Sequence, residues 1–302
     1  MTLQQMRYAI MIADKGSMNE AAKSLFISQP SLSGTIKELE KEIGISIFRR
    51  TNRGITITAE GKEFLSYARQ MIEQYRMMEE RYLDNKTTKK KFHVSTQHYT
   101  FAVNAFATLV QKFGMDEYEF AIYETRTHEI MDDVKNFRSE IGILCLNDFN
   151  EKVLTKVLHE NDLEFHKLFS CNTYVYLSSS NPLASQKVIT MKELEDYPCL
   201  SFDQGEYNSF YFNEEVLSTY EYKKLIKVND RATILNMMVA INGYTLCSGI
   251  ICEELNGSGF CAIPLACDDI MTIGYVTRRG VTLSKLGNLY IEELRKCQKD
   301  VL

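Results

Sequence analysis

The chain has 302 residues, of which 45% are hydrophobic, 25% are charged and only 4 are prolines. This composition excludes a largely disordered protein. At a typical domain size of about 150 residues, the length predicts two or three domains. No apolar run approaches the roughly 20 residues that span a bilayer, and the N-terminus lacks the apolar core of a signal peptide. We therefore expect a cytoplasmic protein without a membrane partner.

The net charge of −5 conceals an uneven distribution of charge along the chain. Residues 1–91 contain 16 Lys and Arg against 11 Asp and Glu, which gives +5. Residues 92–302 contain 19 Lys and Arg against 29 Asp and Glu, which gives −10. A basic head on an acidic body indicates that only the head contacts phosphates.

Two short helices are predicted near the N-terminus. Ser17 precedes the first as a helix cap, and Glu20 stands three residues later, as in a capping box. The second begins at Ser28, with a proline in its first turn, and ends at Gly44. Its apolar stripe is Leu32, Ile36 and Leu39. Two helices joined by a tight turn, the second with small polar residues outward, predict a helix-turn-helix that fits the major groove of DNA.

The residues after this motif predict a hairpin wing. A basic turn at residues 48–54 leads into an alternating strand at 55–58. Arginines in such a wing reach backbone phosphates or a narrow minor groove.

A long helix is predicted from Thr58 to about residue 85. Its apolar residues recur at steps of three and four over several turns, which is typical of a coiled-coil-like seam. The seam packs either on the chain's own core or on a second copy. Because a solvated linker with three lysines follows at 87–91, we favour a two-fold dimer that presents two recognition helices to a palindromic site.

The head resembles the LysR-type transcriptional regulators. The resemblance is dense over residues 1–65. It is carried by GSMNEAAKSL at 16–25, ISQPSLS at 27–33, IKELE at 36–40, IG at 43–44, FRR at 48–50 and TAEG at 58–61. Gly34 stands where the family often has arginine, so operator preference does not transfer. The DNA-binding residues that the resemblance implies are Gln29, Ser31, Ser33, Lys37, Arg49, Arg50 and Arg53.

The acidic body alternates strands and helices. Strands are predicted at residues 92–95, 119–123, 141–145, 164–169, 174–177 and 244–247, and helices at 101–113, 128–137 and 234–241. This alternation indicates an α/β domain with a largely parallel sheet.

The resemblance implies that this domain has two lobes like a type 2 periplasmic binding protein, crossed twice by the chain, with a ligand cleft between them. The fold is thus α+β and multi-domain. We expect a winged helix-turn-helix at 1–58, a linker and dimerisation helix at 59–91 and an effector-binding domain at 92–302. Lobe I comprises 92–163 and 267–302, and lobe II comprises 164–266.

A pocket is predicted where strands of the body end and helices begin, because ligands of open α/β folds bind there. Hydroxyls and free backbone N–H groups at such a point suit an anionic effector, although the same residues also serve as simple helix caps. The effector-binding residues that we predict are Ser95, Thr96, Gln97, Arg126, Thr127, Phe202 and Thr233.

Two other mechanisms compete with a small-molecule effector. A redox switch would use Cys199 with Cys171 or Cys247, although the 8 cysteines contain no C-x-x-C pair. An enzyme would need a catalytic motif, and the sequence has no G-x-S-x-G, P-loop or G-x-G-x-x-G. The five histidines have no metal-ligand spacing. We expect no catalytic residues, no metal and no cofactor.

The resulting prediction is a DNA-binding transcription regulator. Its expected partners are double-stranded DNA with a palindromic operator, further copies of itself in a dimer and a tetramer, RNA polymerase and a small-molecule effector. Effector binding is expected to shift the lobes and thereby the spacing of the DNA heads.

Overall fold

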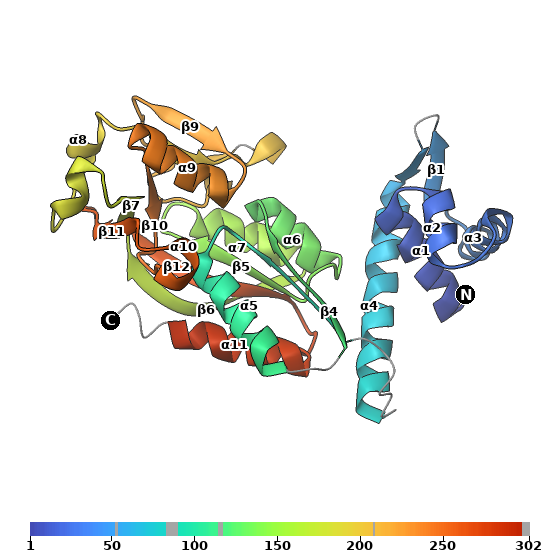
Figure 1. Cartoon of the computed structure of the whole chain (residues 1–302). Coiled ribbons are helices and arrows are strands. Elements are labelled where there is room, and N and C mark those ends of the chain that lie inside the picture. The colour runs from blue at the N-terminus through green and yellow to red at the C-terminus, as the bar shows by residue number, and fades with distance from the viewer. Residues whose placement is uncertain (52–53, 83–89, 114–116, 208, 298–302) are drawn as a thin grey trace. The chain divides into compact units, whose positions relative to one another are not determined.

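The chain folds into two compact units, residues 1–88 and 89–302 (Figure 1). The computed structural model describes residues 1–51, 54–82, 90–113, 117–207 and 209–297. Unit 1 holds the basic head, and unit 2 holds the acidic body.

Unit 1 is helical with one hairpin. Its elements are α1 (Leu3–Lys15), α2 (Met18–Ser24), α3 (Gln29–Ile43), β1 (Phe48–Thr51), β2 (Gly54–Ile57) and α4 (Ala59–Tyr82). The helix-turn-helix and the hairpin are confirmed, whereas α1 was not predicted. The long helix predicted over 58–85 is present through Tyr82, and 83–89 lie outside the described residues.

The caps read from the sequence start the two short helices. The Ser17 hydroxyl accepts the N–H of Glu20 at 3.4 Å, and the Ser28 hydroxyl accepts the N–H of Ser31 at 3.3 Å. Gly44 ends α3 with a φ of 75°, in the left-handed region that glycine adopts without a steric cost. The first and last residues of α3 are therefore determined by local signals.

A single apolar core holds unit 1 together. Ile12, Leu32, Leu39 and Ile47 are fully buried in it. Because Leu32 and Leu39 occupy one face of α3, the opposite face is left to solvent. Helix α4 packs on α1, and Arg69 of α4 pairs with Asp14 at 2.5 Å.

Unit 2 contains two five-stranded sheets among its described residues, with strand orders β4-β3-β5-β12-β6 and β11-β7-β10-β8-β9. The strands are β3 (Lys90–Thr96), β4 (Tyr118–Glu124), β5 (Ile141–Leu146), β6 (Leu163–Asn172), β7 (Tyr174–Ser178), β8 (Cys199–Phe202), β9 (Leu225–Val228), β10 (Tyr244–Cys247), β11 (Phe260–Pro264) and β12 (Ile270–Arg278). Each sheet mixes parallel and antiparallel pairs, where the sequence predicted largely parallel ones.

Helices cover the faces of these sheets. They are α5 (Thr100–Phe113), α6 (Thr127–Lys135), α7 (Glu151–Glu160), α8 (Met191–Leu194), α9 (Arg231–Ile241), α10 (Glu253–Asn256) and α11 (Lys285–Lys296), with short 3-10 turns η1 (Pro182–Ser185), η2 (Gly205–Tyr207) and η3 (Phe210–Phe212). Helices α5 and α11 lie side by side (Figure 1). Each sheet with its helices is one lobe.

The chain crosses between the lobes twice, once between β6 and β7 and once between β11 and β12. The two crossing segments are hydrogen-bonded to each other. Leu265 donates its N–H to the Thr173 carbonyl at 3.0 Å, and the Thr173 hydroxyl donates to the Asp269 carbonyl at 2.9 Å. The lobes are thus joined by one short double connection, as in a hinge.

The first crossing lies later than the sequence indicated. The predicted boundary between 163 and 164 placed the strand at 164–169 in lobe II. In the structure this strand is part of β6, which pairs along its whole length with β12 in the first sheet. Lobe II therefore begins at Thr173, because hydrogen bonding to a distant strand, rather than any local pattern, decides to which sheet β6 belongs.

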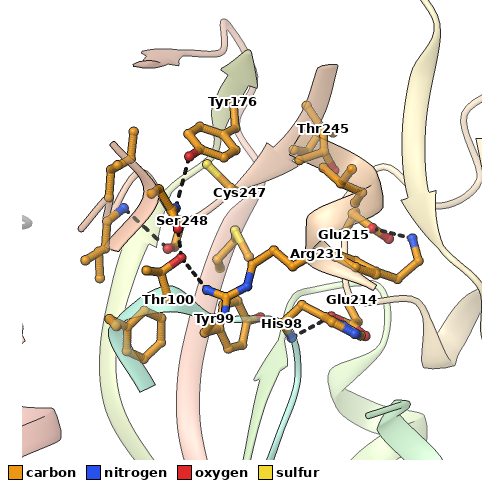
Figure 2. A pocket seen from close by; sticks show the side chains of 18 residues that line it. His98, Tyr99, Thr100, Tyr176, Glu214, Glu215, Arg231, Thr245, Cys247 and Ser248 are labelled. Carbon is orange, nitrogen blue, oxygen red and sulfur yellow. Dashed lines mark hydrogen bonds and ion pairs between the residues drawn. The ribbon is translucent and has the colours of Figure 1, made fainter. Parts of the chain in front are cut away.

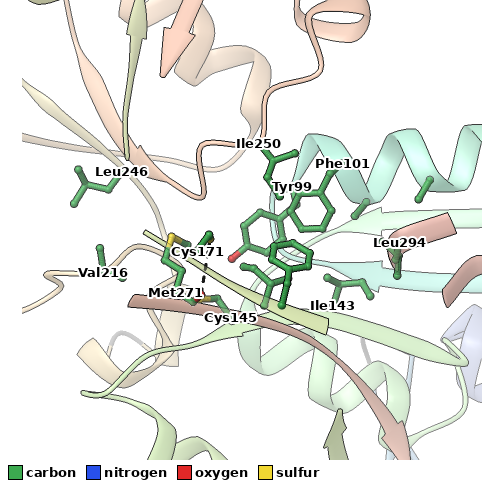
Figure 3. Packing of buried hydrophobic residues seen from close by; sticks show 14 of the residues in the cluster. Tyr99, Phe101, Ile143, Cys145, Cys171, Val216, Leu246, Ile250, Met271 and Leu294 are labelled. Carbon is green, nitrogen blue, oxygen red and sulfur yellow. Dashed lines mark hydrogen bonds between the residues drawn. The ribbon is translucent and has the colours of Figure 1, made fainter. Parts of the chain in front are cut away.

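The core of unit 2 surrounds the first turn of α5. Tyr99 and Phe101 stack with their ring centroids 5.0 Å apart, and Cys145, Cys171 and Met271 surround them (Figure 3). The Tyr99 hydroxyl donates to Gln97 at 3.1 Å. The segment that joins β3 to α5 is therefore rigid.

Gly61 of α4 lies close to the backbone of Ile47, the residue directly before the hairpin. A Cβ atom at Gly61 would lie 2.2 Å from the Ile47 carbonyl oxygen, whereas one at Gly34 would meet nothing within 4 Å. Gly61→Ala should lower the stability of unit 1 by roughly 1–3 kcal/mol through this overlap. The control Gly34→Ala should be neutral or stabilising by about 0.5–1 kcal/mol. Urea unfolding of the full chain, followed by amide exchange in α1 and α3, measures unit 1 separately. Equal stabilities for the two variants would contradict the packing.

Candidate functional site

The outer face of α3 carries the predicted DNA-contacting side chains. Ser31 and Lys37 are exposed, and Gln29 and Ser33 are half-buried. All four stand on one helix whose opposite face is buried in the core of unit 1. The N-terminal half of α3 therefore presents short polar groups and a cation, which suits base edges and phosphates.

The hairpin is tied to α3 by one carboxylate. Glu40 of α3 accepts the backbone N–H groups of Ile47 and Phe48 at 2.7 and 3.0 Å. Arg49, on β1, is exposed. Arg50 pairs through its backbone with Ile55, but its side chain and the whole of Arg53 lie outside the described residues. Arg49 is thus held at a fixed position relative to α3.

A cavity lies between the two lobes of unit 2 (Figure 2). The centre of a water molecule can occupy a volume of about 70 Å³ in this cavity. A single water needs about 10–15 Å³ on this measure, so the cavity has room for several waters or one small ligand. It is lined by His98, Tyr99, Thr100, Phe101, Tyr176, Phe202, Glu214, Glu215, Arg231, Ile234, Thr245, Leu246, Cys247, Ser248, Ile250, Ile251, Asn256 and Met271.

A buried ion pair joins the lobes at this cavity. The Nδ1 atom of His98, from lobe I, lies 2.9 Å from a carboxylate oxygen of Glu214, from lobe II, and both side chains are only 5% exposed. The same carboxylate accepts the backbone N–H of His98 at 3.0 Å. The imidazole stacks on Phe202, with ring centroids 3.7 Å apart. Burial alone would lower the pKa of His98, but the Glu214 carboxylate outweighs it and the pKa lies above 6.5.

A second polar network crosses the cavity between α9 and α5. Arg231 donates to the Thr100 hydroxyl at 2.8 Å and pairs with Glu124 at 2.8 Å. Asn256 donates to the Thr100 hydroxyl at 3.2 Å and to the Tyr176 hydroxyl at 3.0 Å. Arg231 and Asn256 belong to lobe II and Thr100 and Glu124 to lobe I, so this network also bridges the lobes.

Glu215 lies in the wall of the cavity with both carboxyl oxygens engaged. One oxygen accepts the N–H of Phe202 at 2.9 Å, and the other accepts the Ser201 hydroxyl at 3.1 Å. Burial, followed by the neighbouring Glu214 carboxylate, raises the pKa of Glu215 to about 7. The site therefore holds a carboxyl group that changes charge near neutral pH.

The structure does not bring all of the predicted effector residues to the cavity. Only Phe202 lines it. Ser95 is fully buried and bonded to Asp133 at 2.6 Å, and Thr96 donates to the Gln97 carbonyl at 2.8 Å. Thr233 is bonded to Asp230, as part of the cap of α9. The hydrogen-bonding groups of these residues are thus engaged away from the cavity.

Three other predicted residues form a clasp between the lobes. Arg126 donates to the carbonyl and the carboxylate of Asp203, each at 3.0 Å. The Thr127 N–H donates to Gln204 at 3.2 Å, and the Gln97 amide donates to the Thr127 hydroxyl at 2.6 Å. At this point, therefore, polar groups of lobe I bond to residues of lobe II.

Several residues of the site were not singled out from the sequence. His98 directly follows the predicted Ser95–Gln97 segment, and its place between a strand and a helix was the available signal. Glu214, Arg231 and Thr245 stand in segments that carry no motif. The fold of lobe II brings these three residues to the cavity, where they face His98 of lobe I.

Of the cysteines of the redox alternative, Cys171 and Cys199 are buried and Cys247 is half-buried. Burial raises the pKa of Cys171 to about 11 and that of Cys247 to about 12, and it also raises the pKa of Cys199. All three are free thiols. The described residues contain no cluster of three or more His, Cys, Asp or Glu side chains able to hold a metal ion. Within the described residues, no helix combines the length and the apolar character needed to cross a membrane.

Comparisons with known proteins agree with this architecture. Residues 3–62 match the bacterial regulatory helix-turn-helix of the lysR family, and residues 99–298 match the LysR substrate binding domain. The chain is 25% identical to the uncharacterized HTH-type transcriptional regulator YbhD of Escherichia coli strain K12, over 93% of this chain and 87% of that protein.

Two solved structures share the fold. A full-length OxyR variant from Pseudomonas aeruginosa has a TM-score of 0.70 at 20% identity, covering 98% of this chain and 95% of that one. CbnR in complex with its target DNA has a TM-score of 0.57 at 17% identity, covering 98% of this chain and 100% of that one.

A winged helix-turn-helix unit followed by a two-lobed unit with a cavity defines a DNA-binding transcription regulator with an effector-binding domain. The chain belongs to the LysR family of bacterial regulators.

The titration of Glu215 and His98 predicts how stability depends on pH. Both pKa values are raised in the folded state, from 4.5 to about 7 for Glu215 and above 6.5 for His98. Such groups stabilise the fold below their unfolded pKa, and this contribution is lost as pH rises through the folded pKa. The free energy of unfolding of unit 2 should therefore fall between about pH 4.5 and 7 for Glu215, and above about pH 6.5 for His98.

Denaturation of the full chain at pH 5, 6, 7 and 8 measures these two losses. Glu215→Gln keeps an acceptor for Phe202 and a donor for Ser201, so it should remove the loss between pH 5 and 7. Glu221→Gln, at an exposed glutamate, is the control and should follow the wild type. An unchanged pH slope in Glu215→Gln would contradict the assignment.

Proposed function

We propose that this regulator binds a palindromic operator as a dimer or tetramer and that a small molecule in the interlobe cavity controls its activity. Helix α3 enters the major groove with Gln29, Ser31 and Ser33 near bases, while Lys37 and the arginines of the hairpin hold phosphates. The bound dimers contact RNA polymerase. The observation that carries the effector part is the cavity itself, which is closed by polar contacts from both lobes.

The arrangement of unit 1 supports the DNA-binding part of this proposal. Lys37 and Arg49 are exposed, while the core-facing side of α3 is buried. Residues 1–91 carry +5 and the remainder −10, so the phosphate-attracting charge lies in the part that contains α3.

The exposed face of α4 supports self-association. Tyr67, Met71 and Met78 are 58%, 47% and 51% exposed. They follow one another at steps of four and seven residues, so they share one face of the helix. A second α4 helix packed on that face would bury these side chains and present two copies of α3 to a two-fold site.

The cross-lobe contacts support control by a ligand. His98 with Glu214, Arg126 with Asp203 and Arg231 with Glu124 all join the two lobes. A molecule bound in the cavity contacts walls from both lobes and so favours one lobe arrangement over another. The resulting change in lobe geometry would alter how dimers pair and how the DNA is bent.

The DNA-binding prediction rests on counterion release. Lys37→Ala should lower operator affinity and reduce the slope of log affinity against log salt by about 1, because one phosphate contact is lost. Arg49→Ala should act in the same way. The control is Lys41→Ala, an exposed lysine in the last turn of the same helix, which should keep the wild-type slope. Gel-shift titrations at several salt concentrations measure all three, and equal slopes throughout would refute the phosphate contacts.

The thiol prediction separates ligand control from redox control. Because burial disfavours the thiolate, Cys171, Cys199 and Cys247 in the native protein should react with iodoacetamide at pH 7.5 roughly a hundredfold or more slower than free cysteine. Peroxide should then leave operator binding unchanged. Mass spectrometry of alkylated peptides measures each site, and the urea-unfolded chain is the control. Rapid native alkylation of Cys199 with a change in operator binding would favour the redox switch instead.

A further inference from the structure

The place where the sequence predicted an anionic ligand already holds a carboxylate of the protein itself. Glu214 accepts both the backbone N–H and the ring nitrogen of His98, at the point where β3 leads into α5. Both side chains are buried, and Phe202 covers the imidazole. A second carboxylate at this position would have to displace Glu214.

The other ionisable groups that line the cavity are also engaged by groups of its walls. Arg231 pairs with Glu124 and is held by the Thr100 hydroxyl. Glu215 accepts one hydrogen bond on each carboxyl oxygen. An anionic ligand would therefore lose its hydration without finding a cation that is free to pair with it, and a cationic ligand would have to compete for the Glu215 oxygens with the donors that already occupy them.

The remaining lining is largely apolar, and one polar atom in it stands out. Its apolar part is formed by Tyr99, Phe101, Ile234, Leu246, Ile250, Ile251 and Met271. Thr245 lines the same cavity and is only 5% exposed, yet within the described part of the chain its hydroxyl oxygen has no hydrogen-bond partner. A buried hydroxyl without a partner is costly, and a ligand that bonds to it would remove that cost.

We propose, resting on the function proposed above, that the effector is an uncharged, largely apolar molecule about the size of one substituted ring, with one hydrogen-bonding group directed to Thr245. The cavity of about 70 Å³ has room for such a molecule. Glu214 acts as a built-in counter-anion that keeps carboxylates out of the anion position. This proposal departs from the anionic effector that the sequence favoured.

A matched set of ring compounds tests the charge of the ligand. Benzyl alcohol, benzoate and benzylamine share a shape but are neutral, anionic and cationic at about pH 7.5. Binding to the full chain is titrated by ligand-observed NMR. We expect benzyl alcohol to bind at least tenfold more tightly than either charged compound.

Two substitutions test the assigned roles, and a third locates the binding. Thr245→Val should weaken the binding of benzyl alcohol by roughly threefold to tenfold, which is the effect of one hydrogen bond, and should leave the binding of toluene unchanged. Glu214→Ala should strengthen the binding of benzoate, because the position of the Glu214 carboxylate becomes vacant. Glu214→Gln serves the same purpose if the alanine variant does not fold. Ile234→Trp fills the cavity and should abolish all binding, with circular dichroism as the check of its fold.

The outcomes separate the ligand class from the proposed function. Binding of benzoate or benzylamine as tight as that of benzyl alcohol, blocked by Ile234→Trp, overturns the ligand class and leaves the effector cavity intact. Absence of binding by all three compounds, or binding that Ile234→Trp leaves unchanged, also overturns the class. The proposed function fails separately if compounds that fill the cavity leave operator binding by the full chain unaltered.

Discussion

The pair formed by His98 and Glu214 is the interaction on which the geometry of unit 2 depends. The His98 and Glu214 side chains are each only 5% exposed, so the hydrogen bond between them replaces the water that burial removes. One group belongs to each lobe, so the pair determines how the lobes meet. The cavity, the clasp of Arg126 on Asp203 and the network of Arg231 all require this same approach of the lobes.

The two units divide the work of the regulator according to their chemistry. Unit 1 buries one face of α3 in an apolar core and leaves its polar face and Lys37 to solvent, which provides a surface for DNA. Unit 2 contains a small and largely apolar cavity whose ionisable groups are engaged by its walls, which provides a site for a small molecule.

Local signals predicted unit 1 well and the site in unit 2 poorly. Ser17, Ser28 and Gly44 set the ends of helices through bonds to near neighbours, so the sequence alone indicates them. Strand β6 and the unpredicted β12 belong to the first sheet only because they pair across a separation of about a hundred residues. Glu214 meets His98 across a similar separation. Such contacts follow from topology, which no local periodicity encodes.

Amide hydrogen exchange at His98 and Thr127 tests the central claim most directly. Both N–H groups donate to side chains of the opposite lobe, Glu214 at 3.0 Å and Gln204 at 3.2 Å. If the buried pair holds the lobes together, both amides are protected in the wild type, and Glu214→Ala accelerates exchange at both. Rapid exchange of both amides in the wild type, or acceleration confined to His98 in the variant, would contradict the account.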